Sequence, residues 1–461
     1  MYEHLSLDSQ RASDYELQAQ LRAIQRRLKT GEDELQSLVI PEGGLFVHSF
    51  YGYALINMSL DRRSDTEFCQ RSCSEIETIL EKIKQISTRA PFNLNDKLNP
   101  RGGIIIAGHA NLLRAGYLLI GGNSQKIKQD FHLCSAEIAN SFLVGKVPLP
   151  PCYVGYTWAQ DSIFALESLR LHDAIFHSDY SKAREAWLEW MRNHLDGDSG
   201  MMVAQVDPNT GQILDGPRGC ALSWALAFLP NIDSQFAASQ FTRFRKDWFV
   251  PFAGMLGIYE WYRGHNQPTQ FHAGPVVFGL GAAATGIGIG TCRANGDYTS
   301  SNLLLRSLNT LGFPLWTPTG EKSYFYGQCL LADVLSLWGE TVRPWGISSA
   351  PPTQFEAPAI QQEEQRIPFL IVLALAMAIS AAIIGALIWR TVSLFTAKSQ
   401  ERPGWRRATI IALALQTCAV AAFFITPALS FLQLLIFMAI VDLLEEMTIR
   451  PAIVAGIFAQ E

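Results

Sequence analysis

The residues best suited to chemistry lie where a proline-rich loop meets an apolar helix, within residues 150–173. The prolines of this loop cannot propagate a helix, whereas from Ile163 onward the apolar residues recur at roughly helical spacing. Cys152, Gln160 and Asp161 fall at this junction. A carboxyl group and a thiol ahead of an apolar helix indicate a site, although Asp161 could equally cap the helix.

An aspartate held among aromatic side chains has its neutral form favoured by desolvation, so it can donate a proton near neutral pH. A protonated Asp161 could add a proton to an alkene or help a hydroxyl group leave as water. Aromatic rings would stabilise the resulting carbocation by about 0.5–2 kcal/mol per well-placed ring. His109 or Cys152 could then take up a proton from the neighbouring carbon. The expected chemistry is dehydration, hydration, isomerisation or cyclisation, with no cofactor.

Further residues at the starts of apolar helices, or in the loops before them, are expected to line the same cavity. The predicted substrate-binding residues are His48, Tyr51, Asn111, Tyr156, Trp158, Gln160, Trp224, His272, Tyr324 and Tyr326. A pocket that combines aromatic rings with a few polar groups suits a lipophilic substrate. Structural roles stay open as well: a core hydrogen bond for His48 or His109, and an inert thiol for Cys152. Glu260 and Arg263 are predicted to form an ion pair.

Apolar and polar helices alternate along residues 44–348. The apolar helices begin near His48, His109, Asp161, Ala221, Pro275 and Tyr326, and the polar ones span roughly 65–87, 126–144, 180–194, 235–248 and 298–311. A polar helix at 14–29 could supply the sixth outer member. Helices that are apolar all round must be buried, and amphipathic helices can cover them. The pattern predicts an all-α fold, an (α/α)6 barrel, with an α-solenoid as the competing architecture.

The C-terminal fifth of the chain, residues 367–461, is predicted to be a membrane domain. Residues 367–389 carry no charge over 23 positions, which is long enough to cross a bilayer. A second span begins at 408, and Pro427 separates it from a short third span or from its own kinked end. The predicted domains are 1–43 (N-terminal helix and lead-in), 44–348 (barrel), 349–366 (linker) and 367–461 (membrane domain).

The side of the membrane is indicated by two opposing signals. The basic loop between the first two spans favours a cytoplasmic loop and an external barrel. No secretory signal precedes the barrel, and this argues for a barrel on the cytoplasmic side of an integral membrane protein, which is the placement we expect.

Composition limits the partners. A formal charge of −5 gives no reason to expect nucleic acid. The eight cysteines form no C-x-x-C pair, and no metal-binding or nucleotide-binding motif is present. The expected partners are a small lipophilic substrate and a membrane, and the sequence leaves homo-oligomerisation open.

A family resemblance is visible around the candidate residues. The run from Gly108 to Leu119, with His109, Asn111 and Tyr117, resembles the Gly-His-x-Asn-Leu-x-x-x-x-Tyr motif of the linalool dehydratase/isomerase family. The spacing onward to Cys152 fits that family too. Segments 178–190, 207–211 and 241–249 are similar to it in order and spacing. The resemblance covers roughly residues 46–339.

This resemblance implies an (α/α)6 barrel that acts on an isoprenoid alcohol or alkene without a cofactor. In the family, a His and two Cys line the pocket, with an upstream Tyr–Asp pair. His109 matches the family His and Cys152 the first Cys, whereas Asp161 replaces the second Cys and the upstream pair has no match. The leading hypothesis is a membrane-anchored lyase or isomerase of this type, with Asp161, His109 and Cys152 as catalytic residues.

Two other hypotheses stay open. The first is a carbohydrate-active enzyme, either an epimerase or a glycosidase that pairs Asp161 with Asp215 or Glu260. The second is a non-catalytic lipid-binding or scaffold domain tethered to a membrane.

Overall fold

The computed structural model describes residues 2–93, 98–153, 155, 157–252, 254–264 and 274–345. The predicted linker and membrane spans, Tyr156 and His272 lie outside these residues. In the described part of the chain, no helix combines the length and the apolar character needed to cross a bilayer. The chain divides into two compact units, residues 1–324 with 329–366, and residues 325–328 with 367–461. The helical barrel belongs to the first unit.

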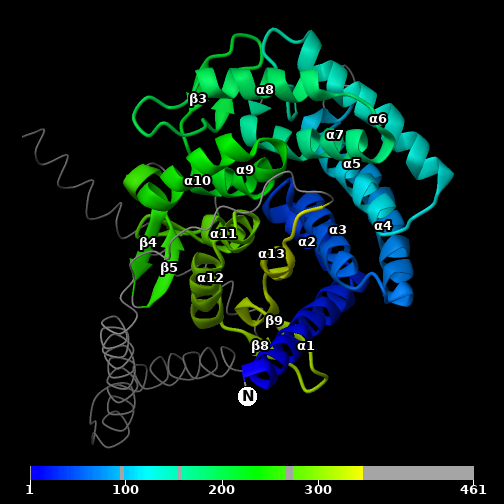
Figure 1. Cartoon of the computed structure of the whole chain (residues 1–461), viewed down its shortest axis with the longest axis vertical. Coiled ribbons are helices and arrows are strands. Elements are labelled where there is room, and N and C mark those ends of the chain that lie inside the picture. Colours follow the sequence, from blue (N-terminus) through cyan, green and yellow to red (C-terminus); the bar gives the residue numbers. More distant parts are fainter. Residues whose placement is uncertain are drawn as a thin grey trace, which may run out of the picture. The chain divides into compact units, whose positions relative to one another are not determined.

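Six inner helices form a closed ring (Figure 1). They are α3 (Gly43–Asp61), α5 (Gly103–Leu119), α7 (Ser162–Phe176), α9 (Gly219–Ile232), α11 (Ala282–Ala294) and α13 (Leu330–Thr341). Each packs against the next, and α13 packs against α3, which closes the ring. These helices are apolar on nearly all sides, and almost every residue of α3 is buried.

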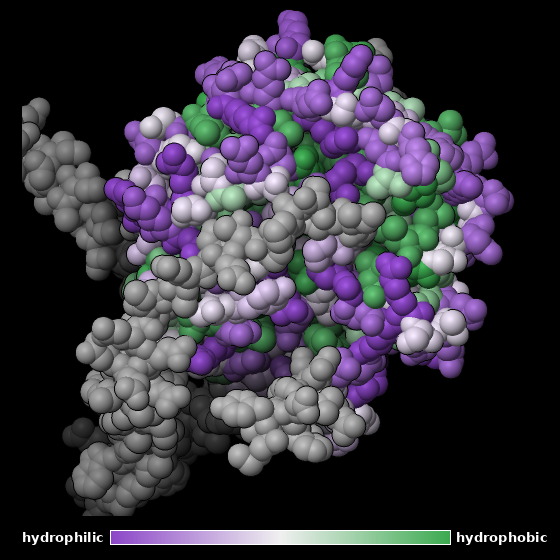
Figure 2. Space-filling view, in the orientation of Figure 1, coloured by the Kyte–Doolittle hydropathy of each residue, from purple (hydrophilic) through white to green (hydrophobic). Residues whose placement is uncertain are grey.

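An outer layer covers the ring. It consists of α4 (Thr66–Ile86), α6 (Gln125–Val144), α8 (Ser181–Asn193), α10 (Ser234–Trp248), α12 (Tyr298–Leu311) and α1 (Tyr2–Lys29), each packed on one or two inner helices. The short helix α2 (Glu32–Val39) joins α1 to α3. Figure 2 shows that hydrophilic residues dominate the visible surface of this layer. The predicted alternation is confirmed, and the outer helices α4, α6, α8, α10 and α12 begin and end within one residue of the expected bounds.

Side-chain caps explain why the outer helices start where they do. The side chains of Asp65, Ser124, Asp233 and Asp297 each accept a hydrogen bond from a backbone N–H in the first turn of α4, α6, α10 and α12. Such caps satisfy one of the unpaired donors at a helix start and contribute about 1 kcal/mol each.

Two inner helices start later than predicted. The apolar run after Pro275 forms a hairpin of β6 (Val276–Val277) and β7 (Leu280–Gly281) before α11 begins. Phe278 and Gly279 at its tip have φ values of 51° and 79°, which no right-handed helix accommodates. Likewise, α13 begins at Leu330, and Tyr326 has a φ of 53°.

The other short strands also lie in connections that lead from an outer helix to an inner one. They are β1 (Thr157–Trp158), β2 (Gln205–Val206), β3 (Ile213–Asp215), β4 (Phe249–Phe252), β5 (Met255–Ile258), β8 (Leu315–Trp316) and β9 (Lys322–Ser323). The strands β1, β2 and β3 form one antiparallel sheet. These connections lie at the end of the ring where inner helices begin, which we call the N-terminal face.

Aromatic side chains fill the centre of the ring. The Phe50 ring centroid lies 4.5 Å from that of Trp224 and 4.9 Å from that of Trp338. Phe164 stacks 4.0 Å from His109 in the same cluster. Helix α11 contributes Gly290, where a Cβ atom would lie only 2.9 Å from the Trp338 ring. A glycine at position 290 therefore lets α11 pack closely enough against Trp338 for the ring of inner helices to close around the aromatic cluster.

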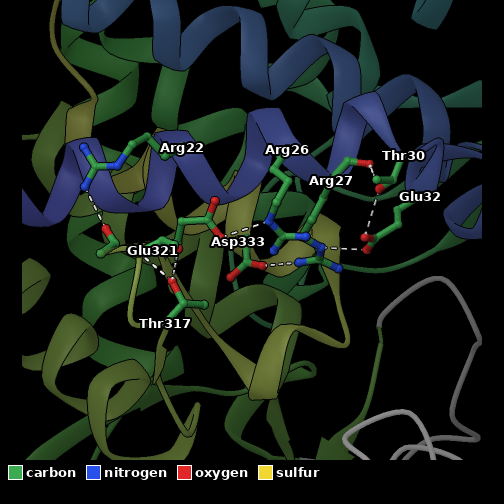
Figure 3. Close-up of polar contacts among 10 residues, drawn as sticks. Arg22, Arg26, Arg27, Thr30, Glu32, Thr317, Glu321 and Asp333 are labelled. Atoms are coloured by element: carbon green, nitrogen blue, oxygen red, sulfur yellow. Dashed lines mark hydrogen bonds and ion pairs between the residues drawn. The ribbon is translucent and has the colours of Figure 1, made fainter.

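A buried ion pair attaches α1 to α13 (Figure 3). The Arg27 side chain is 3% exposed; its Nη1 donates to Asp333 Oδ2, and its Nε donates to Glu32 Oε2 at 2.7 Å. Asp333 Oδ1 also accepts from Tyr324 N at 2.5 Å. Burial raises the pKa of Asp333 to about 7, and the opposite charge of Arg27 counteracts this rise. This ion pair holds the sixth outer helix in place.

Replacing Arg27 should destabilise the protein far more than replacing its neighbour. Arg27→Met leaves the Asp333 carboxyl buried without its cation, and we expect the free energy of unfolding to fall by about 3 kcal/mol. Arg26→Met is the matched control, because Arg26 is 51% exposed in its pair with Glu321, and such surface pairs contribute less than about 1 kcal/mol. Urea unfolding of both variants measures the difference. An equal loss in the free energy of unfolding for both variants would show that the buried ion pair does not hold α1 in place.

Candidate active site

Asp161 ends the 3-10 helix η1 (Ala159–Asp161) and directly precedes α7. Its side chain makes no capping hydrogen bond with α7, so the capping interpretation does not apply. The carboxyl group hydrogen-bonds with the Cys152 thiol instead. Cys152 Sγ also accepts from Trp158 N at 3.2 Å, which folds the intervening loop around the sulfur atom. Asp161 as a whole residue is partly exposed.

Burial raises the pKa of Asp161 to about 7, the hydrogen bond from Cys152 lowers it, and the nearby Glu42 carboxylate raises it. A large fraction of Asp161 is therefore protonated at neutral pH. Burial and the Asp161 charge both raise the pKa of Cys152 well above its usual range. The sulfur thus stays a thiol, which suits a hydrogen-bond donor to Asp161 better than a nucleophile.

Glu42 completes this group, which we call the Asp161 cluster: Glu42, Cys152, Tyr153 and Asp161. Glu42 directly precedes α3 and is 5% exposed. It hydrogen-bonds with the Tyr153 hydroxyl and helps to raise the pKa values of Tyr153 and Asp161. Glu42 is not predicted from the sequence, because Pro-Glu-Gly-Gly resembles an ordinary turn. The available signal is its position, since it precedes an inner helix as Asp161 does.

A second buried group, the Arg218 cluster, consists of Asp215, Arg218, Cys220 and Glu260. Arg218 Nε donates to Glu260 Oε1 at 3.0 Å, and Arg218 Nη1 lies 3.6 Å from Asp215 Oδ2. Glu260 also accepts from Cys220 N at 3.2 Å and from Cys220 Sγ at 3.0 Å. Burial raises the pKa values of both Asp215 and Glu260.

The predicted ion pair between Glu260 and Arg263 is wrong. Glu260 is paired with Arg218, whereas Arg263 Nη2 lies 3.2 Å from Asp247 Oδ1. Arg263 has a φ of 50°, and its side chain is 59% exposed. Glu260 is fully buried. A buried carboxylate requires a cation that is buried with it, and Arg218 meets this requirement where the exposed Arg263 does not.

Trp158 lies between the two clusters. In the three-stranded sheet, Trp158 is in register with Gln205 and Gln205 with Asp215, so these side chains share one face. Two strand spacings place the Cα atoms of Trp158 and Asp215 about 10 Å apart. The Arg218 guanidinium carbon lies 5.9 Å from the centroid of the Trp158 ring. The N-terminal face therefore carries acidic groups on both sides of one tryptophan.

His109 lies deeper than Asp161. Its Nδ1 is 2.9 Å from Tyr53 Oη, and its ring stacks on Phe164, one turn after Asp161 in α7. Burial lowers the pKa of His109 to about 3, so the imidazole is neutral. Nε2 is buried and has no hydrogen-bond partner among the described residues. The structure pairs Cys152 with Asp161 but does not place His109 in contact with either.

Several other predicted site residues hold helices together. His48 Nε2 pairs with Asp33 at 2.9 Å, and Asn111 Nδ2 donates to Ser135 and Ser168, both at 3.0 Å. Tyr51 Oη accepts from Gln25 at 3.1 Å and donates to Glu75 at 3.4 Å, Gln160 donates to Val203 O at 2.7 Å, and Tyr324 donates to Asn309 at 2.8 Å. Each of these side chains therefore already has a structural partner.

Two predicted residues remain well placed for contact with a substrate. Trp224 is partly exposed and packs against Phe46 and Phe50, and Trp158 is partly exposed beside Asp161. Tyr326 belongs to the second unit, so it is not assigned to this site. Within the described residues, no group of three or more His, Cys, Asp or Glu side chains is arranged to hold a metal ion.

No protein-family model matches the chain. Among solved structures, it is similar to an inactive variant of the α-1,6-mannanase of Salegentibacter sp. HEL1_6 in complex with α-1,6-mannotriose. The identity is 12% and the TM-score 0.40, over 64% of this chain and 89% of that one. A family 105 glycoside hydrolase of C. acetobutylicum ATCC 824 matches at 10% identity and a TM-score of 0.42, over 67% of this chain and 98% of that one. At these TM-scores, neither likeness bears on what this chain does.

The raised pKa of Asp161 predicts a pH-dependent stability difference. The folded state holds a proton that the unfolded state releases between about pH 4 and 7, so ionising Asp161 destabilises the fold as the pH rises. Asp161→Asn removes this penalty. The stability of the variant relative to the wild type should therefore rise between about pH 4.5 and 8, by at most about 4 kcal/mol at 1.36 kcal/mol per pKa unit. Urea unfolding at both pH values tests this, and a constant difference would contradict it.

Proposed function

We propose that this chain is an enzyme that cleaves or forms carbon–oxygen bonds by acid/base catalysis, with Asp161 as the proton donor. One observation supports it above all: Asp161 is partly exposed and has a pKa of about 7. General acids work best when their pKa lies near the working pH. Asp333 has a similar pKa, but its side chain is only 1% exposed and is paired with Arg27, so it is not available to a substrate.

In the first step, Asp161 gives its proton to the leaving oxygen as the carbon–oxygen bond breaks and its electron pair moves to that oxygen. Positive charge develops on the carbon atom, where the rings of Trp158 and Trp224 can stabilise it by cation–π contact. The Asp161 carboxylate that remains is stabilised by the hydrogen bond from Cys152. Glu42 supplies the second carboxylate, which can take a proton from an attacking water molecule or from the adjacent carbon.

A glycoside is the substrate class that the polar groups favour. Glycosidases require two carboxyl groups, one acidic and one ionised, about 5–10 Å apart. The N-terminal face offers Asp161 with Glu42 on one side of Trp158, and Asp215 with Arg218 on the other. Partly exposed tryptophans give a flat surface on which a sugar ring can stack. The deep position of His109 agrees with a reaction that two carboxyl groups carry out.

An isoprenoid alcohol or alkene is the second candidate substrate, as in the linalool dehydratase/isomerase family that the sequence resembles. The aromatic contacts of Trp224 with Phe46 and Phe50 favour it, because they give a lipophilic wall beside the acid. In this case Glu42 would remove a proton from carbon, and the product would be an alkene and water. The expected membrane association belongs to this candidate.

A mass-based assay separates the two candidates. The full chain is incubated with a panel of aryl glycosides and oligosaccharides and with a panel of prenyl alcohols, and addition or loss of water is measured. We expect turnover of glycosides, and a fall of about 10²–10⁴-fold in Asp161→Asn, the range that a general acid contributes. Asp179→Asn, on an exposed residue, is the control. Turnover of prenyl alcohols alone would select the second candidate, and full activity in Asp161→Asn would refute both.

Cys152 has a distinct expected effect, that of a positioning residue. Its hydrogen bond lowers the pKa of Asp161, so Cys152→Ala should shift the alkaline limb of the kcat/KM profile to higher pH while activity persists at neutral pH. Loss of all activity with an unshifted profile in a folded variant would indicate that the sulfur reacts directly.

A further inference from the structure

A cavity lies at the opposite end of the ring from Asp161. Its volume is about 300 Å³, and it lies between the last turns of α3, α11 and α13 and the outer helices α1 and α12. Glu42 precedes α3, and Met58 and Asp61 at the end of α3 line this cavity. A helix of 19 residues is about 28 Å long. The cavity is therefore separate from the candidate active site.

Arg293 lines this cavity with a guanidinium group that lacks the usual partners in the described part of the chain. The described residues offer its guanidinium no hydrogen bond and no ion pair; its Nε is buried without a partner, and its nearest aromatic neighbour is the Tyr298 ring, 5.7 Å away. Leaving this buried N–H donor unsatisfied is costly. Burial lowers the pKa of Arg293 accordingly.

The other charged groups around the cavity already have partners. Arg62 Nη2 donates to Asp14 at 3.1 Å, and Asp61 pairs with Arg343. Glu340 Oε1 accepts from Gln20 Nε2 at 2.8 Å; burial raises the pKa of Glu340, and the charges of Lys322 and Arg293 lower it. Among the charged side chains that line the cavity, Arg293 is the one that makes no hydrogen bond or ion pair with the described residues.

The remaining wall is partly apolar. Leu17, Met58, Ile289 and Leu305 line the cavity together with the charged groups. At about 30 Å³ for each water-sized group, its volume accommodates roughly ten non-hydrogen atoms. A free inorganic anion would leave most of this space and the apolar side chains unused.

We propose that this cavity binds a small monocarboxylate with an apolar body of about ten non-hydrogen atoms, whose carboxylate pairs with Arg293. The planar guanidinium matches a carboxylate in bidentate geometry. The hydrocarbon part lies against Met58 and Ile289. The ligand contacts both an inner pair of helices and α1, so its binding stabilises the attachment of the N-terminal helix.

Isothermal titration of the full chain with benzoate tests this inference. Benzamide has the same shape without the charge, and inorganic phosphate has the charge without the apolar body. We expect benzoate to bind, with Kd raised about tenfold or more in Arg293→Met because a charge-assisted hydrogen bond is lost. Benzamide and phosphate should bind at least about tenfold more weakly than benzoate. Arg63→Met removes an exposed arginine next to Arg62 and should leave Kd unchanged.

Three results would overturn the inference: no binding of benzoate, equal binding of benzoate and phosphate, or equal affinity in Arg293→Met and the wild type. Thermal unfolding of Arg293→Met without ligand verifies that this variant is folded. Benzoate should also bind Asp161→Asn with unchanged affinity, because the two sites lie at opposite ends of the ring. This keeps the test independent of the proposed enzymatic activity.

Discussion

Packing of aromatic rings at the centre of the helical ring is the constraint on which the rest of the structure depends. Phe50 contacts Trp224 and Trp338, and Phe164 stacks on His109, so the inner helices meet through these rings. Buried aromatic side chains dominate core energetics, and their edge-to-face pairs add about 0.5–1.5 kcal/mol each. Because aromatic rings fill the centre, the proposed chemistry is assigned to the N-terminal face and the proposed ligand site to the opposite end. The same packing isolates His109 from water and from Asp161.

The electrostatics of the N-terminal face are set by this geometry. Asp161 lies at the edge of the aromatic cluster, where desolvation outweighs the hydrogen bond from Cys152 and raises the pKa of the carboxyl to about 7. In the Arg218 cluster, hydrogen bonds compensate more fully for the burial of the carboxyl group. Glu260 is fully buried, but Arg218 and Cys220 supply it with hydrogen bonds, so it can position Arg218 beside Trp158. Asp161 is thus partly protonated at neutral pH, whereas Glu260 is bound to Arg218 and Cys220.

The two-layered helical ring is well predicted from the sequence, because its outer helices are amphipathic and four of them begin at Asp or Ser caps. The proximity of Cys152 and Asp161 is predicted too, since only nine positions separate them. The start of α11 was misplaced because the apolar run after Pro275 lacks any local sign of the hairpin turn at Phe278 and Gly279. Pairs such as Arg218 with Glu260, or His109 with Tyr53, join distant segments, and no periodicity in one sequence indicates them. Glu42 is not indicated by the sequence either, because it lies in a Pro-Glu-Gly-Gly segment that resembles an ordinary turn.

Asp161 is expected to be largely protonated up to neutral pH, and infrared difference spectroscopy measures the protonation of its carboxyl group directly. The C=O stretch of a protonated carboxyl group, isolated by subtracting the spectrum of Asp161→Asn from that of the wild type, is followed from about pH 4 to 9. We expect the band to persist at about pH 6 and to disappear with a midpoint near pH 7. A midpoint near about 4, the ordinary value for an exposed aspartate, would contradict it.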